Sequence, residues 1–110
     1  MDVYFDSAAT GKLYSSKSKL QRKLGDKQAA KVMTRLKQLE QAESLEELRN
    51  APGRCHELTA DRAGQLSLDL VHPMRLIFRP EEQPPPRNEG DTLDWARIDA
   101  VVILEIDDPH

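Results

Sequence analysis

The sequence predicts an α+β fold, in which two helices of the N-terminal half pack on one face of a mostly antiparallel sheet of about five strands. Residues 7–42 carry apolar positions at helical spacing, residues 64–79 alternate as a β-hairpin does, and residues 100–104 form the apolar run of a buried strand. Helices followed by a group of strands, without regular alternation, are typical of the α+β class.

The N-terminal elements follow from local patterns. Residues 3–5 are apolar and short, which suits an edge or first strand. Leucines at 13, 20 and 24 predict one helix over 7–24, which Gly25 ends. A second helix is expected over 26–42, antiparallel to the first, with Asp26 able to cap it.

Residues 44–59 lead from the helices into the sheet. Ser44 and Glu47 have the spacing of a capping box, which predicts a short helical turn over 45–50. Pro52 and Gly53 should end that turn, and a strand is expected from Cys55 to Thr59, followed by a turn over 61–64.

The hairpin is the strongest single pattern. Leucines at 66, 68 and 70 alternate with Ser67 and Asp69, and an apolar triplet at 76–78 lies between Arg75 and Arg79. His72 should lie exposed in the turn. The last strand is expected over 97–106, with Trp95 packed near its start and with residues 100–104 in the interior of the sheet. The opposite face of the sheet is expected to be free.

The chain of 110 residues is long enough for one domain, 1–110. Residues 80–94 hold four of the seven prolines and five acidic residues, which predicts a flexible loop insertion outside the sheet. The prolines at 84–86 also fit a polyproline ligand, but a plain spacer is the simpler interpretation.

Charge is divided unevenly along the chain. Residues 1–40 hold nine Lys or Arg against four acidic residues, and residues 41–110 hold seven against fifteen, giving +5 and −8. All seven lysines lie before residue 38. They either form an electrostatic footprint for RNA or the ribosome, or are an ordinary solvated helix surface.

Cys55 is the single cysteine, which excludes an internal disulfide and a four-cysteine zinc site and favours a buried structural thiol in a cytoplasmic protein. The longest apolar run, 100–104, is too short to span a bilayer, and residues 1–6 do not resemble a signal peptide, so neither membrane insertion nor export is expected.

Arg75 begins the second hairpin strand beside the turn. Its guanidinium could reach a phosphate across an open face of the sheet, since a planar fork of donors suits that anion. The alternative is an ordinary arginine that solvates a strand end.

Two segments carry a resemblance to a known family. HELTADRAGQLSLDLVHPMRLIFRP (56–80) resembles the central signature of the RelE/ParE toxin superfamily, especially its HigB-type branch, in which a Leu-x-Gly-Asp-Arg-x-Gly run precedes a hairpin ending in Arg-Leu/Ile-x-Phe. Residues 101–110 resemble the closing strand of that family and its final Asp-Tyr-His. The resemblance implies a RelE-like fold.

It also implies a function: the toxin of a bacterial type II toxin–antitoxin pair, acting as a ribosome-dependent mRNA endonuclease. Cleavage would proceed by attack of the 2′-hydroxyl without metal or cofactor, leave a cyclic phosphate and inhibit translation. The implied partners are mRNA, the ribosome and a HigA-like helix-turn-helix antitoxin, through which alone operator DNA would be bound.

The resemblance assigns roles to four residues. His56 would be a general base or acid, Arg75 would contact the scissile phosphate, and Asp108 and His110 match the terminal Asp-x-His. By their positions, Arg62 and Arg79 are secondary candidates for RNA contact, although Arg62 could instead pair with Asp61 or Glu57, and Arg79 could bind an acidic partner.

The sequence also departs from the family pattern. Pro109 stands where the family has a tyrosine, Ala60 stands where it has a glycine, and no lysine follows residue 37. These departures favour a second hypothesis, a toxin-fold protein that acts only by binding, as a ParE-like topoisomerase inhibitor or as a catalytically impaired regulatory partner. An unrelated α+β adaptor would not explain residues 56–80.

Overall fold

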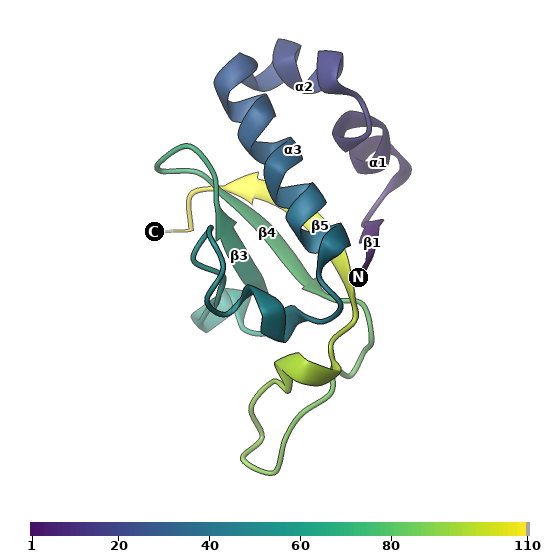
Figure 1. The fold of residues 1–110 in the computed structure, drawn as a ribbon, viewed down its shortest axis with the longest axis vertical. Helices are drawn as coiled ribbons and strands as arrows, with labels where there is room; N and C mark the ends of the chain where they lie inside the picture. The colour runs from purple at the N-terminus through teal and green to yellow at the C-terminus, as the bar shows by residue number, and fades with distance from the viewer. Residues whose placement is uncertain (110) are drawn as a thin grey trace.

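A computed structural model describes residues 1–109, and its elements confirm the α+β class (Figure 1). They are β1 (Asp2–Phe5), α1 (Ala8–Tyr14), α2 (Lys17–Leu24), α3 (Asp26–Gln41), β2 (His56–Glu57), β3 (Leu66–Asp69), β4 (Arg75–Pro80) and β5 (Ala100–Asp107). Short 3₁₀ turns cover Leu45–Leu48, Ala60–Arg62 and Trp95–Arg97.

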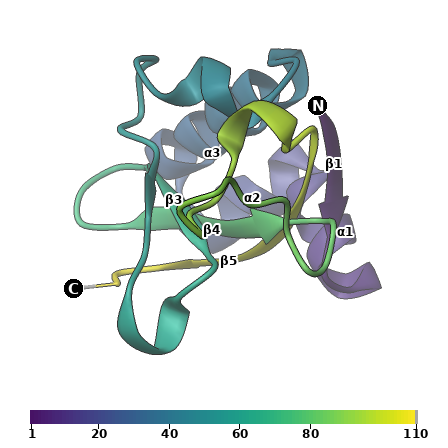
Figure 2. The ribbon, with the colours of Figure 1, turned by 90° about the horizontal axis from the view of Figure 1, so that it is seen from below.

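The five strands form one open sheet in the order β1-β5-β4-β3-β2. β1 pairs with β5 in parallel, and all other neighbours are antiparallel. β5 therefore lies in the interior of the sheet and β1 at its edge, as the sequence predicts. α3 lies across one face of the sheet, and α1 and α2 lie toward one end of the molecule (Figures 1 and 2).

The single helix expected over 7–24 is wrong, because the chain forms two helices with a break at Ser15 and Ser16. The Ser16 hydroxyl accepts a hydrogen bond from the Lys19 amide at 3.2 Å, which caps α2. A serine side chain that satisfies a free amide in this way favours the start of a new helix over continuation of the old one. The fold thus has three helices before β2, not two.

Two cap predictions also need correction. Gly25, with φ of 84°, ends α2 and is itself the N-cap of α3, while Asp26 is the first helical residue and interacts with the helix dipole from there. The turn after Ser44 forms, but the Ser44 hydroxyl makes no capping hydrogen bond. Glu47 accepts instead from the Glu43 amide at 2.9 Å.

The core lies between the helices and the sheet. Its fully buried side chains come from both layers: Leu20, Val32, Leu39, Leu66, Leu68, Leu76, Phe78, Val101 and Ile103. Alternation places these strand residues on the helix side. Burial of this apolar surface is the main stabilising contribution to the fold.

An irregularity in β5 decides which side chains near its end face away from the helices. Ile77 pairs with Glu105 while Phe78 pairs with Ile103, so Leu104 is an extra residue. A bulge of this kind reverses the alternation beyond it. Ile106 consequently packs against the core, and Asp107 lies on the opposite face.

The face away from the helices is not free, contrary to expectation. Figure 2 shows the teal segment around residues 58–64 on that side of the sheet. Ile77, which alternation places on this face, is 0% exposed, and Arg75 is 3% exposed. The segment that links β2 to β3 therefore covers part of the sheet that the sequence pattern leaves open.

The acidic insertion stays outside the sheet, as predicted, although Pro80 still pairs with Val101 at the end of β4. An isolated bridge joins Arg87 to Leu93, and the chain returns to the body at Trp95, which is buried. The loop extends away from the end of the molecule that carries α1 and α2 (Figure 1). Its flexibility stays a prediction.

Trp95 connects this return to the strand that carries His56. The indole N–H donates to the Glu57 carboxylate at 3.1 Å, and the Arg49 guanidinium lies 4.2 Å from the ring centroid.

No helix within residues 1–109 is long and apolar enough to cross a bilayer.

Gly53 is the glycine whose replacement should cost most. Its φ is +106°, and an added Cβ would lie 3.0 Å from Leu68 Cδ2 and 3.1 Å from the Arg35 guanidinium. We expect Gly53→Ala to lower the free energy of unfolding by about 1–3 kcal/mol in urea denaturation. Gly90→Ala is the matched control, since its Cβ would meet nothing closer than 3.6 Å. Equal stability of the two variants would contradict this packing.

Candidate functional site

An open groove of about 580 Å³ lies where β2, the 60–62 turn and the end of β5 meet. Three residues expected at the site, His56, Arg62 and Asp108, line it. The remaining lining residues are Glu57, Leu58, Thr59, Ala60, Asp61, Asp107 and Pro109. The structure thus brings together residues from both segments that carry the family resemblance.

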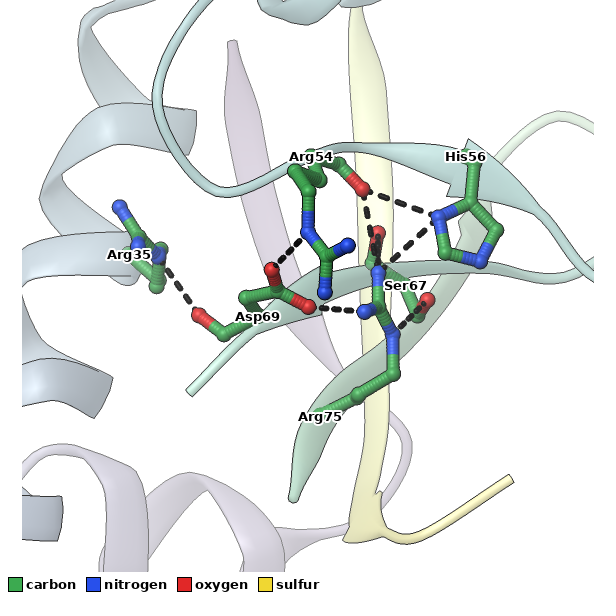
Figure 3. Close-up of polar contacts among 6 residues, drawn as sticks. All are labelled: Arg35, Arg54, His56, Ser67, Asp69 and Arg75. Carbon is green, nitrogen blue, oxygen red and sulfur yellow. Dashed lines mark hydrogen bonds and ion pairs between the residues drawn. The ribbon is translucent and has the colours of Figure 1, made fainter. Parts of the chain in front are cut away.

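Arg75 lies beside this groove but not in it. Its Nε donates to Ser67 Oγ at 2.6 Å, its Nη1 forms an ion pair with the Asp69 carboxylate, and its Nη2 donates to the Arg54 carbonyl at 3.1 Å (Figure 3). Burial lowers the pKa of the guanidinium, and the nearby Asp69 carboxylate offsets part of that effect. Its donors are thus already used within the protein.

Arg75 does not face an open surface of the sheet in this arrangement, and its expected contact with the scissile phosphate stays a prediction. With 3% of its surface exposed, the side chain is enclosed by the neighbouring strand and by the backbone at residue 54. A phosphate oxygen would have to displace one of these partners before it could bind the guanidinium.

His56 and Arg75 do come together. The Arg75 Nη2 atom lies 3.1 Å from His56 Nδ1, and the same ring nitrogen lies 3.0 Å from the Arg54 carbonyl oxygen. Figure 3 shows the other ring nitrogen, Nε2, pointing away from Arg54 and Arg75. The exposed imidazole, which lines the groove, thus has one nitrogen beside Arg75 and the Arg54 carbonyl and one outside these contacts.

The backbone conformation at Gly53 and Arg54 determines the direction of the Arg54 carbonyl. The Gly53 carbonyl accepts from the Asp69 amide at 2.7 Å, which fixes the segment against β3. Arg54 has φ of 47°, a left-handed backbone conformation that residues other than glycine rarely adopt. This turn presents the Arg54 carbonyl to both His56 and Arg75.

Asp69 is the negatively charged partner of Arg54 and Arg75. Besides its pair with Arg75, its carboxylate accepts from Arg54 Nε at 2.5 Å, and its carbonyl accepts from Arg35 Nε of α3 at 2.7 Å. Burial alone would raise the pKa of Asp69, but the hydrogen bond from Arg54 and the charges of the three arginines lower it below its ordinary value. The carboxylate is ionised at neutral pH.

Arg62 is held by the end of β5. Its Nη2 lies 2.5 Å from Asp107 Oδ2, and its Nη1 lies 3.6 Å from a Glu105 oxygen. The alternative partners Asp61 and Glu57 are therefore wrong. The bulge at Leu104 makes these contacts possible, because it turns Asp107 to the face on which the 60–62 segment lies.

The groove is acidic. Among the described residues, four carboxylates line it, from Glu57, Asp61, Asp107 and Asp108, against the single guanidinium of Arg62. Such a surface repels polyanions unless cations from elsewhere offset it. This charge is the strongest observation against simple RNA binding at the groove.

The other candidates lie apart from this arrangement or outside the described residues. Arg79 donates to the Pro80 carbonyl at 2.9 Å and is four residues from Arg75, roughly 13 Å along the strand. His72 is exposed in the hairpin turn, as predicted. His110 lies outside the described residues, so its expected convergence with His56 stays a prediction.

Cys55 is buried, as the sequence predicts for a structural thiol. Burial raises the pKa of the thiol to about 12, despite the lowering effect of Arg75 and Arg49. A thiol in that state is a poor nucleophile at neutral pH. Within residues 1–109, no group of three His, Cys, Asp or Glu side chains is arranged to hold a metal ion.

The sequence interpretation missed Arg54, Ser67 and Asp69. A signal for the last two was present, since Ser67 and Asp69 alternate with leucines and must face away from the core. Hairpin pairing sets Asp69 opposite Arg75. Arg54 carried no comparable signal, because it lies outside the alternating strands and contributes both a backbone carbonyl and a side-chain contact with Asp69.

The fold of residues 1–109 is also found in a solved toxin structure. A solved structure with this fold is the YoeB/ParE toxin from Agrobacterium tumefaciens, which matches over 100% of both chains with a TM-score of 0.57 and 11% sequence identity. At that identity the likeness is one of fold. No family model and no curated protein sequence matches the chain.

Asp69→Asn should lower the free energy of unfolding by about 1.5–3 kcal/mol at neutral pH, because Arg75 loses its charged partner. Since the folded-state pKa of Asp69 is lowered, its stabilisation is complete above the unfolded value of about 3.9 and is lost as the pH falls through the folded value.

Urea denaturation of both proteins between pH 7 and pH 2.5 checks this prediction. The difference between wild type and variant should be largest near pH 7 and shrink below pH ~4. Asp99→Asn, at an exposed position, is the control and should change little. A difference that is independent of pH would contradict the proposed ion pairing.

Proposed function

We propose that this protein is the toxin of a bacterial type II toxin–antitoxin system and that it acts in the cytoplasm as a ribosome-dependent mRNA endonuclease. The observation that carries the proposal is the setting of His56, whose ring is fixed by an arginine and a backbone carbonyl at the edge of an open groove. The shared toxin fold supports it.

The reaction proposed is metal-free transesterification. The ribose 2′-oxygen attacks the adjacent phosphorus, the bond from phosphorus to the 5′-oxygen breaks, and a 2′,3′-cyclic phosphate and a 5′-hydroxyl form. One group must accept the 2′-hydroxyl proton, and another must donate a proton to the departing oxygen. His56 and the carboxylate of Asp108 are the acid–base candidates, and Arg62 is the cation nearest the phosphate in the groove.

The proposed contact with the ribosome follows from the charge distribution. None of the seven lysines forms an ion pair within residues 1–109, and all lie on α1, α2 and α3. A surface of unpaired lysines suits contact with RNA of the ribosome, which would hold the acidic groove near mRNA. A HigA-like helix-turn-helix antitoxin would neutralise the toxin and bind operator DNA.

A second candidate function is favoured by specific observations. The burial of Arg75 and the carboxylates around the groove suit a toxin-fold protein that acts only by binding, as a topoisomerase inhibitor or as a regulatory partner. Such a protein needs neither a fixed imidazole nor an accessible guanidinium.

Inducing expression of the protein in a bacterial host that lacks the antitoxin distinguishes between the two candidate functions. We expect wild type to arrest growth and to create new 5′ ends in translated messages, and His56→Ala to reduce cleavage by about 10²–10⁴-fold. His72→Ala, at an exposed turn histidine, is the matched control and should remain toxic. Arg75→Ala is unsuitable because it removes a buried, paired side chain.

Two other outcomes are informative. Growth arrest with intact messages would reject cleavage and favour the binding function. Full cleavage by His56→Ala would remove His56 from the site even if the protein is a nuclease.

A further inference from the structure

The contact between Arg75 and His56 restricts where the imidazole can carry its proton. A guanidinium only donates hydrogen bonds, whereas each nitrogen of a neutral imidazole is either a donor or an acceptor. Arg75 Nη2 lies 3.1 Å from His56 Nδ1, which is a favourable contact only when Nδ1 presents its lone pair. A proton on Nδ1 would face a fixed positive charge.

The guanidinium has little freedom to avoid this contact. Nε is bonded to Ser67 Oγ, Nη1 is paired with Asp69, and the side chain is 3% exposed. Asp69 is in turn held by Arg54 and by Arg35 of α3. The position of Nη2 is thus determined by β3 and α3 rather than by the histidine.

The Arg54 carbonyl favours the opposite tautomer of His56, with the proton on Nδ1. At 3.0 Å from Nδ1 it would accept a proton carried there, but it already accepts from Arg75 Nη2 at 3.1 Å. The electrostatic field of the cation separates the two arrangements, since a lone pair directed at a guanidinium is attracted and an N–H directed at it is repelled.

We propose that Arg75 is a positioning residue that fixes the proton of neutral His56, a residue lining the groove, on Nε2, the ring nitrogen that does not contact Arg75. His56 therefore presents an N–H donor to whatever occupies the groove, and an anion such as a phosphate oxygen is the matching ligand. Arg75 acts through the imidazole instead of contacting the phosphate itself.

One consequence rests on the proposed function. A neutral imidazole protonated on Nε2 cannot accept the 2′-hydroxyl proton at that atom. His56 then donates to the phosphate or to the departing 5′-oxygen, and the proton acceptor must be another group of the groove, which is lined with carboxylates. The tautomer itself does not depend on the protein being a nuclease.

Nuclear magnetic resonance of the ¹⁵N-labelled protein, without RNA, tests the tautomer. Long-range ¹H–¹⁵N correlations at a pH where histidines are neutral should show His56 protonated on Nε2 alone, and exposed His72 as a mixture of tautomers. Arg75→Met, with its fold checked from amide spectra, removes the cation and should let His56 populate the tautomer protonated on Nδ1, beside the Arg54 carbonyl. A proton on Nδ1 in wild type would overturn the proposal.

A second variant avoids any risk to folding. His56→Ala changes an exposed side chain. It should shift the Arg75 Nη2 resonance and leave Nε, which is bonded to Ser67, unchanged. An unshifted Nη2 resonance would show that the contact does not form in solution and would also overturn the proposal.

A matched pair of variants tests the donor role. His56→Gln keeps an N–H at the reach of Nε2, and His56→Phe keeps the size without a donor. We expect Gln to retain measurable mRNA cleavage and Phe to lose about 10²–10⁴-fold. Equal loss in both would reject the donor role. Absence of cleavage in wild type would reject the proposed function, whereas the resonance experiment decides the part of Arg75 separately.

Discussion

The positive charge of Arg75 has to be matched inside the protein, because the side chain lies beneath the segment that links residue 53 to β2 and is cut off from water. Asp69 directly across the hairpin supplies the countercharge, and Ser67, the Arg54 carbonyl and His56 Nδ1 lie within hydrogen-bonding distance of the guanidinium. These contacts tie β3, β4 and the strand that carries His56 into one unit. The position of the imidazole at the groove depends on this unit.

Much of the fold was predictable from local pattern, because alternation and helical spacing report burial directly. The hairpin, the interior position of residues 100–104 and the buried Cys55 follow from it. The break at Ser16 was not predicted, since leucines at 13, 20 and 24 fit one helix as well as two. The bulge at Leu104 and the contact of the Arg54 carbonyl with Arg75 are products of tertiary packing, so the burial of Arg75 could not be predicted from its place in the strand.

Charge is separated along the longest dimension of the molecule, which is 45 Å. The lysines lie on α1, α2 and α3, and the acidic insertion extends from the opposite end (Figure 1). A polyanion would therefore be attracted first to the helices and only then meet the acidic groove. This arrangement reconciles an acidic site with an RNA substrate if a larger RNA assembly supplies the binding energy, and it equally suits a protein partner with a matching charge pattern.

The burial of Arg75 in the native protein is the central claim, and arginine modification tests it most directly. Brief treatment with phenylglyoxal followed by peptide mass spectrometry should label Arg54 and Arg97, whose side chains are 77% and 61% exposed, and leave Arg75 unmodified until the protein is unfolded. Labelling of Arg75 in the folded protein at the rate of these arginines would contradict the account, and would restore the guanidinium as a group that can contact a phosphate.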